Sequence, residues 1–154
     1  PIYNILAAYQ PVFLEYDNHI VEDRCGHELA MQSYCFKTAL EKGVHCSYGT
    51  DSPVEDCNPM LNIYCAVTRK DYNGWPEGGW NPAECVDVET AIDCYTVESA
   101  YMEFKENIKG RIKPGFVADM VLLDKDIFTC DPMQIKDIKC DMTIIDGEVV
   151  YERK

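Results

Sequence analysis

Residues 43–59 read GVHCSYGTDSPVEDCNP, and this stretch decides the fold that we predict for the chain. Val44 to Tyr48 is a short run of β-forming residues bounded by glycines, which is typical of a buried strand. Gly49 and Thr50 follow this run, and Asp51 comes after them, at the start of a turn. In α/β barrels and doubly wound sheets, ligands bind at the carboxyl ends of the strands. Asp51 is therefore a candidate functional carboxylate.

The same residues also fit the start of a helix. Asp51 or Ser52 could be its N-cap, and Pro53 suits the first helical positions. Such capped turns are far commoner than catalytic carboxylates, so spacing alone leaves both interpretations of Asp51 open.

The segment before this stretch completes a βαβ unit. Residues 4–10 are apolar and β-rich, and residues 28–41 carry helix-spaced apolar side chains that end before Gly43. A strand, a helix and a strand in this order predict two parallel, neighbouring strands. The loop of residues 11–24 would then flank the same edge as Asp51. His19 in this loop could be a ligand there, although a single loop histidine is more often simply solvated.

The segment after it changes from helices to strands. Residues 59–68 predict a helix that ends at Arg69, and Asp87 predicts the N-cap of helical turns that run to residue 104. Between them, the glycine-rich loop of residues 71–82 carries Trp75 and Trp80, which either form a lid or partner surface or tuck the loop onto the body. From Gly110 onward we expect a buried strand at 118–123 and a hairpin of 140–145 with 148–151 across Asp146-Gly147.

Composition and charge limit the possible functions. The 154 residues suffice for one domain or parts of two, and the formal net charge is −13. A chain without a basic stripe is a poor ligand for nucleic acid or for an anionic membrane surface. No apolar run approaches the ~20 residues of a membrane-spanning helix.

The nine cysteines form no C-x-x-C pair, which argues against a zinc knuckle. Their odd number and their scatter through apolar stretches suit reduced side chains, so we expect a cytoplasmic location. The chain begins with Pro1 and runs almost at once into an apolar segment, as a piece from the middle of a longer protein would. We therefore expect a fragment.

Several motifs carry a family resemblance. They are Gln10-Pro11, Arg24-x-Gly26, Gly43-Val44, Gly49-Thr50-Asp51-Ser52-Pro53-Val54, Val67-Thr68-Arg69, Lys109-Gly110-x-Ile112-x-Pro114-Gly115-x-x-Ala118-Asp119 and Thr143-Ile144-Ile145-Asp146-Gly147-Glu148-Val149-Val150-Tyr151. In this order they resemble the closing third of the amidohydrolase superfamily, and within it family 3, the YtcJ-like metal-dependent hydrolases. The resemblance extends over nearly the whole chain.

The resemblance implies an α/β fold, the C-terminal fragment of a (β/α)8 TIM barrel. Residues 1–108 would hold its last two βα units, and residues 109–154 the C-terminal part of a small antiparallel β-sandwich. Asp51 then matches the aspartate after the eighth strand, which ligates a divalent metal, zinc or a similar ion, and acts as proton shuttle for cleavage of an amide or other non-peptide C–N bond in a small molecule.

Other site residues are secondary. Ser52 beside Asp51 could contact substrate or only cap a helix, and Arg24 could bind a substrate carboxylate or form a surface ion pair. The family's His-x-His pair and its further ligands are missing from this sequence, and two strands cannot close a barrel of ~250 residues. We therefore expect the fragment alone to bind no active-site metal and to be inactive.

Two other functions remain open. The chain could be a free-standing acidic interaction module that uses the loop of Trp75 and Trp80. Alternatively, copies of the chain could self-associate to cover exposed strand edges and apolar helix faces.

Overall fold

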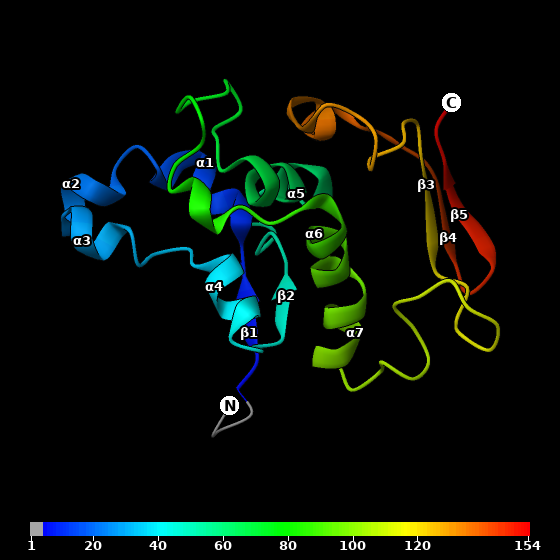
Figure 1. The fold of residues 1–154 in the computed structure, drawn as a ribbon. Helices are drawn as coiled ribbons and strands as arrows, with labels where there is room; N and C mark the ends of the chain where they lie inside the picture. The colour runs from blue at the N-terminus through cyan, green and yellow to red at the C-terminus, as the bar shows by residue number, and fades with distance from the viewer. Residues whose placement is uncertain (1–4) are drawn as a thin grey trace.

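The structure, a computed structural model, describes residues 5–154. Two parallel strands lie at its centre, β1 (Ala7–Tyr9) and β2 (Cys46–Tyr48), as predicted (Figure 1). Ala7 pairs with Cys46 and Tyr9 with Tyr48, so both strands end at the same edge of the sheet. The strands are shorter than predicted, and residue 4 of the expected first strand lies outside the described residues.

Short helical segments connect β1 to β2. They are η1 (Pro11–Phe13), α1 (Leu14–Asp17), α2 (Val21–Cys25), α3 (His27–Ala30) and α4 (Phe36–Glu41). The predicted single helix over 28–41 is therefore wrong. The chain breaks at Tyr34, which adopts a left-handed conformation with φ of 54°. Its hydroxyl donates to Asp17, and its carbonyl accepts a bond from Arg69, so tertiary contacts override the local helical pattern.

Helix α5 (Pro59–Thr68) forms the centre of the core, and α6 (Val88–Tyr95) packs against both α5 and β2. Helix α7 (Val97–Met102) packs against α6 and β2. Between α5 and α6 stands a short turn, η2 (Pro82–Glu84). The carboxylate of Asp87 accepts a bond from the backbone N–H of Thr90 at 2.7 Å, which confirms the predicted N-cap of α6.

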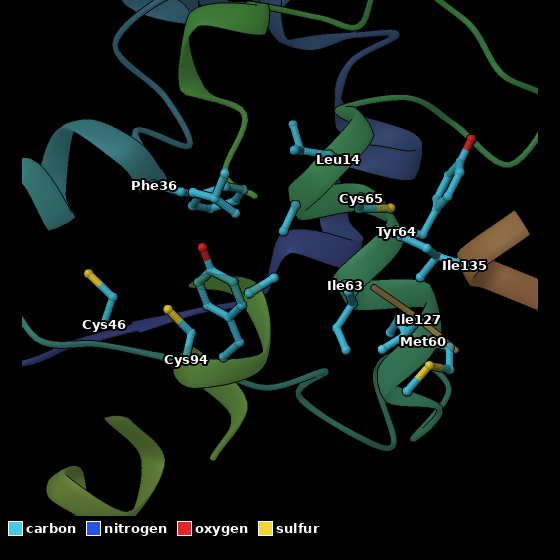
Figure 2. Packing of buried hydrophobic residues seen from close by; sticks show 14 of the residues in the cluster. Leu14, Phe36, Cys46, Met60, Ile63, Tyr64, Cys65, Cys94, Ile127 and Ile135 are labelled. Carbon is cyan, nitrogen blue, oxygen red and sulfur yellow. The ribbon is translucent and has the colours of Figure 1, made fainter. Parts of the chain in front are cut away.

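The core is contiguous, and Figure 2 shows part of it around α5. Ile63, Tyr64 and Cys65 of α5 belong to the same buried cluster as Leu14 and Phe36, which come from the segment between the strands. The link of residues 124–139, which joins two strands of the C-terminal sheet, also enters this core, because Ile127, Ile135 and Ile138 are buried and η3 (Pro132–Asp137) packs on α5. No helix or strand was predicted for this link.

The last part of the chain is a three-stranded antiparallel sheet of β3 (Met120–Leu123), β4 (Cys140–Ile145) and β5 (Glu148–Glu152), at the right of Figure 1. The hairpin across Asp146-Gly147 is confirmed. The carboxylate of Asp119 accepts a bond from the N–H of Asp146 at 2.9 Å, so the Ala118-Asp119 motif anchors this turn.

Several apolar side chains of this sheet are exposed to solvent. Val121 and Leu122 are 57% and 49% exposed, so the prediction of a buried third strand is wrong for this chain. On β5 the exposed residues lie on both faces, with Val150 and Tyr151 exposed by about half. Such a sheet lacks a covering layer among residues 5–154.

All nine cysteines are free thiols, and Cys46, Cys65 and Cys94 lie in the core. Burial raises the pKa of Cys46 to about 11, so this side chain is a neutral apolar group, as expected. Within the described part of the chain, no helix combines the length and the apolar character that crossing a membrane requires.

Candidate functional site

Asp51 stands three residues beyond the last residue of β2, at the edge where both parallel strands end. It opens a turn in which its carbonyl accepts a bond from the N–H of Val54 at 2.8 Å. Its φ is 56°, a left-handed conformation that aspartate tolerates better than most residues, and its side chain is exposed. The carboxylate is thus free to face a ligand at this edge.

Asp51 and Ser52 do not cap a helix. Helix α5 begins eight residues after Asp51, at Pro59, and its N-cap is Asn58. The Asn58 side chain accepts a bond from the N–H of Met60 at 3.0 Å. The capping interpretation of Asp51 and Ser52 is therefore wrong, because Asn58 already satisfies the first turn of α5.

A second polar residue of this edge, Asn62, lies inside α5 and is fully buried. Its Oδ1 accepts from the backbone N–H of Val12, and its Nδ2 donates to the carbonyl of Gly49 at 2.7 Å and to the hydroxyl of Tyr95. One carboxamide thus joins the segments that leave β1 and β2. Asn62 was not among the predicted site residues, although an asparagine within the apolar run PMLNIYCAV of a helix signals a buried polar contact.

His19 forms a cluster with the loop after α5. Its Nε2 lies 3.0 Å from the Oδ2 of Asp71, and its ring stacks on Trp75 at 4.4 Å between centroids. Burial opposes ionisation of Asp71, but bonds from the N–H groups of Trp75 and Asn73 and from His19 prevail and lower its pKa. His19 therefore connects the segment after β1 to the loop after α5 and is not simply solvated.

The remaining candidates are dispersed. Each histidine contacts a different carboxylate: His19 with Asp71, His27 with Glu22 and His45 with Glu98. Arg24 is exposed on α2, at the far left of Figure 1 and well separated from β2, and it has no ion-pair partner within residues 5–154. Across those residues, no three histidine, cysteine or acidic side chains come together in a group that could hold a metal ion. Asp51 could supply one metal ligand.

The two tryptophans have different environments. Trp80 is 6% exposed and belongs to the core, whereas Trp75 is 48% exposed. Trp80 is therefore not part of an exposed aromatic pair, which confirms for this residue the interpretation that the loop tucks onto the body. Arg69 ends α5 as predicted, but its guanidinium is fully buried beneath Trp80.

Comparison with known proteins identifies the family. The model of the amidohydrolase family matches residues 4–151, nearly the whole sequence. The chain belongs to the amidohydrolase family. Among its relatives is the Bacillus subtilis (strain 168) protein YtcJ, which is named as an amidohydrolase and is 37% identical over 149 residues, or 97% of this chain and 28% of YtcJ. The N-substituted formamide deformylase of Arthrobacter pascens is 28% identical over 117 residues, or 76% of this chain and 21% of the relative.

Solved structures agree with this assignment. An uncharacterized metal-dependent hydrolase from Pyrococcus horikoshii matches with a TM-score of 0.68 and 25% identity, over 84% of this chain and 26% of that one. Another from Pyrococcus furiosus matches with a TM-score of 0.62 and 29% identity, over 75% of this chain and 22% of that one. This amidohydrolase chain therefore spans about a quarter of the length of the family members that it matches.

Proposed function

We propose that this chain is the C-terminal part of a metal-dependent hydrolase that cleaves amide or other non-peptide C–N bonds in small molecules. The single observation that carries this proposal is the place of Asp51, at the carboxyl edge of two parallel strands in a chain of the amidohydrolase family. In a barrel, this edge is where catalytic side chains gather.

Asp51 would serve as one ligand of a divalent metal and as the proton shuttle. The metal, zinc or a similar ion, supplies Lewis-acid polarisation of the carbonyl and lowers the pKa of the attacking water. Asp51 would take the proton of that water and return it to the leaving nitrogen. The exposure of its carboxylate suits both tasks, since neither a helix cap nor a buried partner occupies it.

The open sheet supports a larger assembly. The strands β1 and β2 form a sheet of two, although a closed barrel has eight. The sheet of β3, β4 and β5 exposes Val121, Leu122 and Val150, which suits one layer of a β-sandwich whose other layer covers them. In this proposal, residues 1–108 contribute the last two βα units and residues 109–154 part of the sandwich.

The substrate class follows from the same resemblance. The name of the Arthrobacter relative, an N-substituted formamide deformylase, makes an N-formyl amide the first substrate to test. Ser52 beside Asp51 and Arg24 on α2 stay predicted substrate contacts. A cytoplasmic location stays a prediction.

The test uses the intact enzyme, in which we expect a His-x-His pair on the N-terminal side of these 154 residues. We expect purified enzyme to contain a divalent metal and to hydrolyse an N-substituted formamide, and we expect Asp51→Asn to lower kcat by about 10²–10⁴-fold. The matched control is Asp23→Asn, an exposed aspartate on α2, which should leave kcat unchanged. Full activity of Asp51→Asn would remove the assigned role.

A further inference from the structure

We infer that Asn62 is a positioning residue for Asp51, because its buried carboxamide fixes the backbone that carries Asp51 at the edge of the sheet. This inference rests on the proposed function of Asp51. It goes further by assigning to the interior of α5 a part in the geometry of the site.

The contacts of Asn62 reach both strand ends. Val12, whose N–H binds Oδ1, is the third residue after β1, and Gly49, whose carbonyl accepts from Nδ2 at 2.7 Å, directly follows β2. The second Nδ2 donor meets the hydroxyl of Tyr95 on α6. Since Asn62 is 0% exposed, water cannot replace these bonds.

Only a carboxamide suits this position. Val12 presents a donor and Gly49 presents an acceptor, so the side chain between them must accept on one side and donate on the other. A carboxylate of the same shape would accept on both sides and would repel the Gly49 carbonyl. An aliphatic side chain would leave both backbone groups buried without partners. The orientation of the amide is therefore set by the groups on either side of it.

Thr50 is the one residue between Gly49 and Asp51, so a constraint on the backbone of Gly49 is transmitted over a short distance. The N–H of Gly49 donates to the carbonyl of Tyr9 at 3.0 Å, and the side chain of Thr50 is buried. Asn62 holds the carbonyl of Gly49, so both peptide groups of Gly49 are fixed before the chain enters the Asp51 turn. The bond between Val54 N–H and the Asp51 carbonyl closes that turn at 2.8 Å.

The chain from Gly49 to Asn62 therefore forms a closed ring: strand end, turn, first turn of α5, and a side-chain bond back to the strand end. Asparagine has a low propensity for helical positions, so the presence of Asn62 in the first turn of α5 is explained by these tertiary bonds and not by helix propensity. Loss of the bond would loosen the Asp51 turn, which would keep the bond from the N–H of Gly49 to Tyr9, while α5 keeps its N-cap at Asn58.

The experiment compares Asn62→Asp with Asn107→Asp, an exposed amide control, in the intact enzyme. Backbone hydrogen exchange is measured over residues 10–14 and 49–54, and zinc affinity is measured by competition with a chelator. We expect faster exchange in both segments and a zinc affinity weakened about 10–100-fold in Asn62→Asp, with neither change in the control. If Asn62→Asp does not fold, Asn62→Ser, whose hydroxyl can serve only part of the network, gives the same comparison.

A double-mutant cycle separates positioning from general loss of stability. In the Asp51→Asn enzyme, we expect Asn62→Asp to change zinc affinity by less than about 2-fold, because the residue through which it acts is gone. Equal weakening in both backgrounds, or unchanged exchange over residues 49–54, would overturn the inference. If Asp51→Asn alone changes neither zinc affinity nor kcat, the proposed function fails and this inference fails with it. The exchange data then still show whether Asn62 holds the backbone at Gly49.

Discussion

The guanidinium of Arg69 donates from Nε to the carbonyl of Trp80 at 2.7 Å, and both side chains are buried. Its Nη1 donates to the carbonyl of Tyr34 at 2.9 Å, and its Cζ lies 5.3 Å from the centroid of the Phe36 ring. Burial lowers the pKa of Arg69. This side chain fastens the end of α5 to the break in the predicted helix and to the loop that carries Trp80.

We expect Arg69→Lys to lower the free energy of unfolding by about 3 kcal/mol. Lysine lacks the forked guanidinium that donates to the carbonyls of Trp80 and Tyr34 together, so the substitution leaves a buried acceptor unpaired. Denaturant unfolding followed by circular dichroism measures this change. The exposed Arg111→Lys is the control and should stay within about 0.5 kcal/mol of the parent. A similar small effect at both positions would contradict the role of Arg69.

The loop before Trp80 approaches α5 so closely that a side chain cannot fit at Gly79. An added Cβ there would lie 2.4 Å from the carbonyl oxygen of Thr68, whereas one at Gly78 would meet nothing within 4 Å. Both glycines have positive φ, so alanine at either position carries a similar backbone strain of about 1 kcal/mol. We expect Gly79→Ala to cost at least ~1 kcal/mol more than Gly78→Ala in thermal unfolding, and equal costs would show that the loop moves away.

The N-cap of α5 can be tested against the Asp51 turn. Asn58→Ala should destabilise the protein by about 1 kcal/mol, because Met60 loses its side-chain acceptor. Asp51→Gly should change stability by less than about 0.5 kcal/mol, since glycine accepts the φ of 56° at this position and the exposed carboxylate caps no helix. Chemical denaturation of the two variants decides the matter. A larger loss at Asp51 than at Asn58 would return Asp51 to a capping role.

Asp71 should make stability depend on pH in the acid range. Its folded pKa lies below the ordinary value, so its contribution is fully present above the unfolded pKa of about 3.9 and is lost as the pH falls through the folded pKa. We expect Asp71→Asn to be less stable than the parent at pH 7 and to approach it near pH 3. Unfolding curves at both pH values measure this, with exposed Asp23→Asn as the control. A constant difference between pH 7 and pH 3 would contradict the prediction.

The exposed sheet should cause self-association when the 154-residue chain is produced alone. Val150 is 57% exposed on the edge strand β5, and Val54 is 65% exposed on the Asp51 turn, outside the sheet. We expect Val150→Lys to shift the chain toward monomer in light scattering after size exclusion, and Val54→Lys to leave the distribution unchanged. A monomeric parent chain would refute this prediction.

Local sequence patterns gave correct predictions for elements whose hydrogen bonds join residues that are close in sequence. The N-cap Asp87 and the hairpin at Asp146-Gly147 depend on such short-range signals. The parallel order of β1 and β2 was predicted instead from the succession of a strand, a helical segment and a strand. The helix over 28–41 failed because the decisive contacts of Tyr34 come from Asp17 and Arg69, which are 17 and 35 residues away. The exposed β3 failed because an apolar run does not reveal whether a covering layer belongs to the same chain.

The sequence by itself determined the family and placed Asp51 just after a strand. Both predictions need only the order of the motifs and a run of β-forming residues bounded by glycines, which are local properties of the chain. Only the tertiary structure decided that Asn58 and not Asp51 caps α5, that Arg69 is buried, and that Asn62 joins Val12 to Gly49. The last two depend on bonds between segments that are distant in sequence, and no local propensity can specify which distant backbone group a buried polar side chain will meet.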